Sequence, residues 1–320
     1  MRKKRGLFFK NPVFVSGILG FAGIILFSAG CAAPNAQKRI ADFSTALSIA
    51  TTNTTDAFET VDQKFYCTRV ALLVNNYDEK GFNPNTEMHF LTGQDLESRE
   101  QLFKGLQRYA QKLADIMSDT QMKEFDAETK AFGKSLQKLR ENDAFKNINS
   151  GASQTNIDAF TTAVDVVGRF FIDYKREKGV REIVADMKQP IESICNTLVS
   201  DIGQPMDKAG AGGFGLRNQS WIQYEVMLKE HISFIDHHKD KFDPVTKAEA
   251  IAKLPAIVEE QYKADLTLKA TQDTLRKLRM THNELVKAFD KTCPTLENLI
   301  AELIDEGKRV GKFYKSLAKE

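Results

Sequence analysis

Few side chains in this sequence are of a type and spacing that could perform acid–base or metal chemistry. Of the five histidines, three lie close together in one amphipathic segment, where Glu230-His231 is followed by His237-His238. Residues seven apart share a helix face, so Glu230 would lie beside His237 and His231 beside His238. Neither the Glu-x-x-His pattern of carboxylate-bridged metal bundles nor His-Glu-x-x-His occurs here. We therefore predict a solvated polar face and no metal site.

His282 replaces an apolar residue in the stripe between Leu278 and Leu285. We predict a hydrogen-bonded histidine in the core or at its boundary, and no catalyst. The sequence contains no Gly-x-Ser-x-Gly elbow, Walker loop or dinucleotide fingerprint, and the glycine-rich run 210–215 lacks the Lys-Ser/Thr of a phosphate loop. We therefore assign no catalytic or cofactor-binding residue, expect no cofactor, and favour a non-enzymatic role.

Three cysteines, Cys67, Cys195 and Cys293, lie in the body of the chain. Cys67 and Cys195 belong to apolar stripes and could be small buried side chains. A single disulfide between two of the three is the alternative, since exported proteins can form disulfides. Cys293 lies at a predicted helix start and is the one we expect to be exposed.

The first 33 residues have the composition of an export signal. A cationic cluster, Arg2 to Arg5, is followed by an apolar run from Val13 to Phe27 and by the small residues 28–33 around Cys31. A basic, then apolar, then small sequence is typical of a secretory signal, and clustered positive charge stays on the cytoplasmic side. We expect the rest of the chain to lie outside the cytoplasm.

Ala29-Gly30-Cys31 resembles the lipobox of bacterial lipoproteins. The resemblance implies cleavage before Cys31, which then carries lipid such as palmitate. Ala32 rather than Asp follows the cysteine, and this implies the outer membrane, facing the periplasm, in a cell that has one. The alternative is an uncleaved anchor, because 13–33 is about as long as the roughly 20 apolar residues that span a bilayer. Secretion without a tether is the third interpretation.

Composition excludes several classes of protein. With 42% hydrophobic and 28% charged residues, the chain is neither disordered nor a many-spanning membrane protein. Five of the basic side chains lie in the first 30 residues, where there is no acidic one, so the net charge of +2 becomes −3 for the remainder. A body without an excess of basic residues does not favour nucleic-acid binding.

The body has the apolar periodicity of amphipathic helices almost throughout, and no run with a period of two. The stripes lie at 40–65, 102–116, 122–139, 157–174, 180–198, 221–235, 251–289 and 296–317. Asp243-Pro244 has the residue types of an N-cap and a first helical position. The sequence therefore predicts an all-α fold: an elongated antiparallel bundle of about seven or eight helices.

We divide the chain into residues 1–30, a lipoprotein signal peptide or membrane anchor, and residues 31–320, the helical body. The glycine-rich connection 203–218 could separate two halves, 36–200 and 217–320, or could be a mobile loop of one bundle. We expect the run 210–215 to be a flexible linker.

These observations favour a lipid-anchored interaction or scaffold protein of the cell envelope, with a protein partner in that envelope. The tether would be the lipid on Cys31 or a single apolar anchor. The alternative is a helical bundle that binds a ligand or metal, and that could be catalytic, around His282 or segment 230–238. A secreted helical toxin comes third, because the mature chain has no second long apolar stretch.

Overall fold

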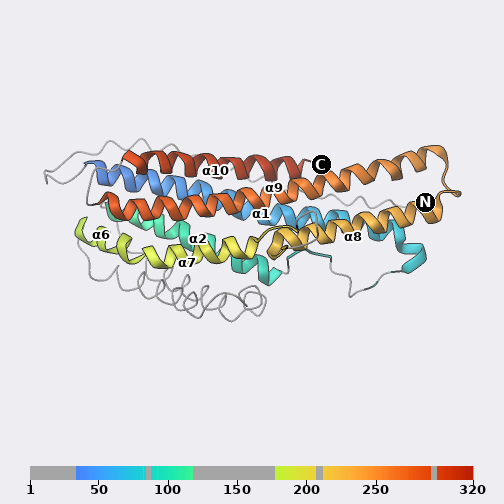
Figure 1. The fold of residues 1–320 in the computed structure, drawn as a ribbon, viewed down its shortest axis with the longest axis horizontal. Coiled ribbons are helices and arrows are strands. Elements are labelled where there is room, and N and C mark those ends of the chain that lie inside the picture. Colours follow the sequence, from blue (N-terminus) through green and yellow to red (C-terminus); the bar gives the residue numbers. More distant parts are fainter. Residues whose placement is uncertain are drawn as a thin grey trace, which may run out of the picture. The chain divides into compact units, whose positions relative to one another are not determined.

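The computed structural model describes residues 34–81, 83, 88–91, 93–117, 177–206, 212–289 and 294–319. Within these ranges the chain forms seven α-helices and no strand beyond one isolated bridge (Figure 1). The helices are α1 (Pro34–Lys80), α2 (Gly93–Met117), α6 (Glu177–Asp186), α7 (Lys188–Ile202), α8 (Gly215–His238), α9 (Pro244–Ala288) and α10 (Pro294–Ala318). Cys31, Cys293 and the stripes expected at 122–139 and 157–174 lie outside the described residues.

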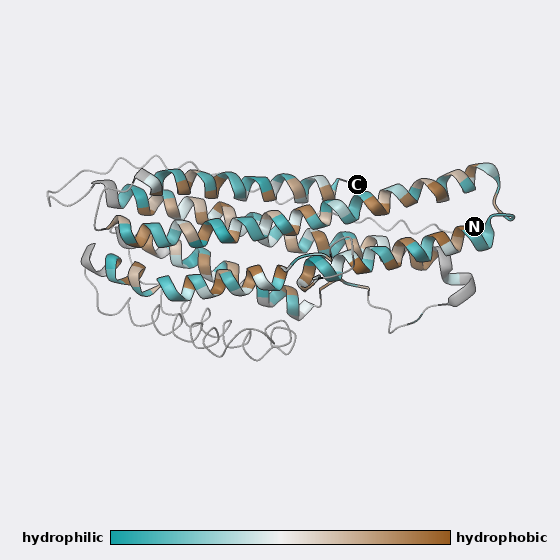
Figure 2. Ribbon diagram, in the orientation of Figure 1, coloured by the Kyte–Doolittle hydropathy of each residue, from teal (hydrophilic) through white to brown (hydrophobic). Residues whose placement is uncertain are grey.

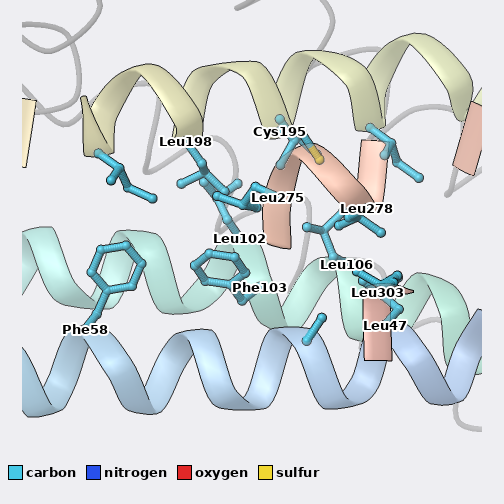
Figure 3. Packing of buried hydrophobic residues seen from close by; sticks show 14 of the residues in the cluster. Leu47, Phe58, Leu102, Phe103, Leu106, Cys195, Leu198, Leu275, Leu278 and Leu303 are labelled. Carbon is cyan, nitrogen blue, oxygen red and sulfur yellow. The ribbon is translucent and has the colours of Figure 1, made fainter. Parts of the chain in front are cut away.

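The predicted all-α bundle is confirmed, and the apolar stripes become its core. All seven helices contribute to the buried cluster, and Figure 3 shows among its members Leu47 of α1, Leu106 of α2, Leu198 of α7, Leu278 of α9 and Leu303 of α10. Burying a leucine of this kind stabilises the fold by about 1.5–3 kcal/mol. Figure 2 shows the corresponding alternation of apolar and polar residues along each helix. No helix of the described part is both long and apolar enough to cross a membrane.

Helices α8, α9 and α10 follow one another as antiparallel neighbours. At the α9–α10 contact, Thr281 Oγ1 lies 3.3 Å from Leu299 O, and Lys277 pairs with Glu302, so the two sequences run in opposite directions. Thr281 also donates to the carbonyl of Lys277, one turn earlier in its own helix, at 2.8 Å. This second bond satisfies a buried hydroxyl without a partner from another helix.

Helix α10 packs against α1 in parallel, which the expectation of antiparallel neighbours did not include. Gly307 faces Ala50 and Gly311 faces Asn53, so both sequences run in the same direction. A Cβ at Gly307 would lie 3.0 Å from the Ala50 Cα, which means that the two backbones meet where glycine faces alanine. The parallel direction follows from the chain order, because α9 is antiparallel to both helices.

The fifth predicted stripe is divided into two helices. Helix α6 ends at Asp186 and α7 begins at Lys188, with Met187 in a turn between them. Pro190 has no N–H to donate to the Asp186 carbonyl, although the neighbouring bonds from Met187 N to Ile183 O and from Ile191 N to Met187 O are intact. The proline therefore explains why the helix is interrupted here.

The glycine-rich connection is anchored at both ends, which corrects the expectation of a flexible linker for residues 212–215. Gln204 and Phe214 exchange two backbone hydrogen bonds of 2.9 Å each. Gly203 and Gly215 have φ values of 66° and 71°, and a Cβ on Gly203 would lie 2.0 Å from the Phe214 carbonyl oxygen. Glycine is therefore required at this crossing.

Helices before and after that connection pack on each other. The buried Gln272 of α9 donates to the carbonyl oxygens of Val199 at 2.7 Å and Gly203 at 3.0 Å. The amide thus gives the Val199 carbonyl, which also accepts from Gly203 N at 3.1 Å, a second partner and supplies one to the carbonyl of Gly203, the C-cap of α7. The end of α7 is therefore held against α9.

Candidate functional site

The hairpin formed by α8 and α9 has the most unusual surface of the described chain. Its turn is fixed locally, because Asp243 accepts hydrogen bonds from Val245 N at 2.8 Å and Thr246 N at 3.1 Å, and Pro244 begins α9. The hydrogen bonds from the side chain and backbone of Thr246 lower the pKa of Asp243. The N-cap predicted from Asp243-Pro244 is confirmed.

The inner face of the hairpin joins the two helices through one ion pair and one histidine. Near the base, Arg217 donates to both carboxylate oxygens of Asp265, at 2.7 and 3.0 Å. Near the tip, the Nε2–H of the buried His231 donates to Ala250 O at 2.8 Å, because a carbonyl can only accept. These contacts are fourteen residues apart on α8, so the hairpin is held together along most of that helix.

Two polar contacts attach the hairpin to α1. Arg69 Nη1 lies 2.8 Å from Glu230 Oε2, and Thr68 donates to Glu260 Oε2 at 2.6 Å. Both acceptors belong to the hairpin, one on each helix, and both donors are neighbours on α1. The orientation of the hairpin on α1 is therefore specified by hydrogen bonds as well as by packing.

Large apolar side chains are exposed to solvent along the hairpin. Seven of the eleven large hydrophobic side chains that are exposed in the described chain lie between residues 222 and 266. We call these seven side chains the outer apolar face: Ile222, Val226, Ile232, Val245, Ile251, Tyr262 and Leu266. Figure 1 shows that α9 extends past the C-terminal end of α10, so that α10 leaves the N-terminal part of α9, next to the turn, uncovered.

An aromatic pair lies at the edge of the outer apolar face. The rings of Trp221 and Tyr262 meet edge to face at 5.5 Å, and Trp221 Nε1 donates to Glu225 at 3.0 Å. Tyr262 remains 57% exposed. Tryptophan and tyrosine are the residue types that most often contribute binding energy at protein interfaces.

Of the three α8 histidines, only His237 is exposed, as the predicted solvated polar face requires, and the other two are wholly or partly buried. His231 is fully buried, Glu230 pairs with Arg69, and His237 Nδ1 donates instead to the carbonyl of Ser233 at 2.7 Å. His238 lies in a half-buried cluster with Phe234 and Phe242. The reason is that α1 and α9 pack on this side of α8, which the sequence of α8 alone does not indicate.

His282 is a core residue, as predicted. It is fully buried, its Nε2 lies 2.9 Å from the hydroxyl of Tyr109, and its ring centroid is 5.9 Å from that of Phe43. Burial lowers the pKa of His282 to about 3, so the ring is neutral at physiological pH. Solvent does not reach the His282 ring, so a ligand could bind there only if a channel to the ring opened.

The two described cysteines have different surroundings. Cys195 is buried, as predicted, and burial raises the pKa of its thiol to about 12. Cys67 is exposed, which corrects the prediction of burial, and its sulfur lies 3.4 Å from Gln63 Nε2. The helix face that carries Cys67 is exposed to solvent near the C-terminal end of α1. Both thiols are free in the structure.

Comparison of the chain with protein-family models, curated proteins and solved structures gives no match. Among the described residues, no group of three or more His, Cys, Asp or Glu side chains could hold a metal ion. The function of the chain is therefore inferred from the geometry of the hairpin formed by α8 and α9.

Sequence reasoning did not identify the outer apolar face. It placed Ile232 and Ile251 in inward-facing stripes, whereas both are exposed. The signal that could have revealed the face is the second set of apolar residues on α8, Ile222 and Val226, one turn apart and opposite the buried Tyr224. When a helix has apolar residues on two faces, one face packs on the core of its own chain. The second face is then available to another molecule.

Proposed function

We propose that this chain is a membrane-tethered lipoprotein of the cell envelope that acts as an interaction or scaffold protein. The leader and the lipobox-like Ala29-Gly30-Cys31 support a lipid anchor on Cys31 and a body outside the cytoplasm. Acyl chains on one cysteine would hold the helical body close to a membrane surface. The outer apolar face would then be presented to other envelope proteins.

The observation that carries this proposal is the concentration of exposed apolar side chains on one hairpin. Soluble proteins rarely leave contiguous apolar patches exposed unless the patch binds something. Ile222 and Val226 are one turn apart on α8, and so are Tyr262 and Leu266 on α9. Rows with this spacing fit the ridges of another helix.

We commit to a protein partner that offers an amphipathic helix. The charges that border the outer apolar face have both signs, as in the Glu259–Lys263 pair at 2.9 Å. A mixed border does not favour an anionic lipid surface or a nucleic acid, which both select an excess of positive charge. It suits a partner helix whose own borders are mixed.

Site-specific photo-crosslinking in intact cells tests the proposal. The photoreactive residue p-benzoylphenylalanine at position 262 should capture one defined envelope protein. Leu266→Glu, one turn away, should abolish that product, because it places a charge inside the contact. Met280→Glu is the matched control, since Met280 is also an exposed apolar residue of α9 but lies about four turns from Leu266.

The outcomes separate clearly. A single product that Leu266→Glu removes and Met280→Glu preserves supports the docking function. A product from position 262 that is insensitive to Leu266→Glu, or that Met280→Glu removes equally, would rule it out. Circular dichroism of both variants should show unchanged helix content.

A further inference from the structure

A pocket lies between α1, the segment that leads into α2, and α8. Its volume is about 650 Å³, within the range of roughly 300–1,000 Å³ that small-molecule sites occupy. It adjoins the outer apolar face on α8, because Gln219 and Gln223 of its lining share a helix face with Ile222 and Val226. The side chains that matter are Phe65, His89, Phe90, Asp95, Gln219 and Gln223.

One wall is preorganised by a carboxylate on α1. Asp62 accepts a hydrogen bond from Leu91 N at 2.8 Å and another from His89 Nδ1 at 2.8 Å. The ring of Tyr66 stacks on His89 with centroids 4.6 Å apart. Because the carboxylate orients the ring through Nδ1, Nε2 of His89 is the nitrogen left to accept from a ligand. The His89 side chain is 51% exposed, so a ligand can reach it.

The opposite wall carries two carboxamides. Gln219 and Gln223 are one turn apart on α8 and both line the pocket. Neither amide has a hydrogen-bond partner among the described residues, although each offers two donors and two acceptor sites. Amides in this position favour a ligand that both donates and accepts.

The other residues that line the pocket indicate the shape and charge of the ligand that would fit it. Phe90 is half-buried and supplies apolar surface, and the buried Phe65 supports it with ring centroids 5.9 Å apart. Among the described lining residues the carboxylate of Asp95 carries a charge, and none of them is a lysine or arginine. An anionic ligand such as a phosphate ester is therefore disfavoured. A neutral ring with apolar faces and hydroxyl edges matches the aromatic, amide and imidazole groups together.

We propose that this pocket binds a saccharide. One sugar face would lie against the Phe90 ring, and the hydroxyl or acetamido groups would bond with Gln219, Gln223 and His89 Nε2. This inference does not depend on the outer apolar face or on the lipid anchor. The ligand could be the end of an envelope glycan or a free oligosaccharide, which share this chemistry.

Titration calorimetry on the purified full-length chain tests the inference, with N,N′-diacetylchitobiose as the probe. The wild-type protein should bind it saturably. Gln219→Ala/Gln223→Ala should weaken binding at least tenfold, since tenfold is about 1.4 kcal/mol, the net value of one or two hydrogen bonds. Gln189→Ala is the matched control, an exposed glutamine on α7 far from the pocket. Thermal unfolding should confirm that each variant is folded.

His89→Phe gives a second, independent readout. It keeps an aromatic ring for Tyr66 to stack on but removes the acceptor, so affinity should fall while the protein remains folded. Displacement of the protein from an insoluble glycan by free disaccharide would identify a glycan end, and binding of the soluble sugar alone would identify a free oligosaccharide. No saturable binding by wild type, equal affinity in the pocket variants, or tighter binding of glucose 6-phosphate or choline would overturn the inference.

Discussion

Arg99 of α2 and Asp201 of α7 form a two-point ion pair inside the bundle. Arg99 Nε lies 2.7 Å from Asp201 Oδ2 and Nη2 lies 2.8 Å from Oδ1, while Nη1 donates to the Asp95 carbonyl at 2.9 Å. The side chains are only 4% and 0% exposed. Each charge therefore depends on the other for its solvation, and the pair fixes the position of α7 on α2.

Removing one partner of this pair should destabilise the fold strongly. Arg99→Met or Asp201→Leu leaves a buried charge without its counterion, and each should lower the free energy of unfolding by about 3–5 kcal/mol. The double variant should recover much of that loss, because two apolar side chains replace the pair. Urea denaturation of the four proteins gives the coupling energy. Additive losses would show that the two groups do not depend on each other.

His282 should make stability depend on pH. Burial lowers the pKa of His282 to about 3, below the value of 6.5 expected in the unfolded chain. Between pH 6.5 and 3 the unfolded state therefore binds a proton that the folded state does not, and stability falls as pH is lowered. The contribution approaches about 1.4 kcal/mol per pH unit. Denaturation from pH 8 to 4 should show a steeper loss for wild type than for His282→Gln. Parallel curves would contradict the assignment.

The parallel contact between α1 and α10 should tolerate no large side chain at Gly307. A Cβ there already lies 3.0 Å from the Ala50 backbone, so Gly307→Leu should cost about 1–3 kcal/mol through overpacking. Ala301→Leu, at an exposed position of the same helix, is the control and should be nearly neutral. Equal melting temperatures for the two variants would argue against the close approach.

The thiols should differ in reactivity. Cys67 is exposed and should react with a maleimide in the native protein, whereas the thiol of Cys195 is buried, and burial raises its pKa to about 12. Peptide mapping after labelling, with and without urea, measures both. A Cys67 that becomes reactive only after reduction would instead show that it forms a disulfide.

The helices could be predicted from sequence because their apolar stripes and caps are local signals. The stripe from Ile40 to Phe65 is buried within α1, and Asp243 caps α9 as expected. These features depend on residues within a few turns of each other, where periodicity and side-chain type are sufficient.

The contacts between distant helices could not be predicted in the same way. The Arg99–Asp201 pair joins residues 102 positions apart, and nothing near either residue in the sequence identifies its partner. The spacing of Gly307 and Gly311 is visible in the sequence, but it does not indicate that Ala50 and Asn53 lie opposite. The exposure of Ile251 likewise depends on where α10 ends. These contacts and exposures depend on tertiary packing. The register between distant helices cannot be derived from a single sequence.

The pocket was missed for a related reason. His89 lies in a connection between two helical stripes, and Asp62 lies on a polar position of the first stripe, so neither stood out. Only the fold brings His89, Asp62 and the glutamines of α8 to one place.

The lipid anchor is the claim on which the envelope location depends, and mass spectrometry of the mature N-terminus tests it most directly. The protein should be isolated from membranes in detergent and its N-terminal peptide sequenced. We predict a chain that begins at Cys31 with a thioether-linked diacylglyceryl group. A chain that retains Met1 with an unmodified Cys31, recovered from the soluble fraction, would contradict the account.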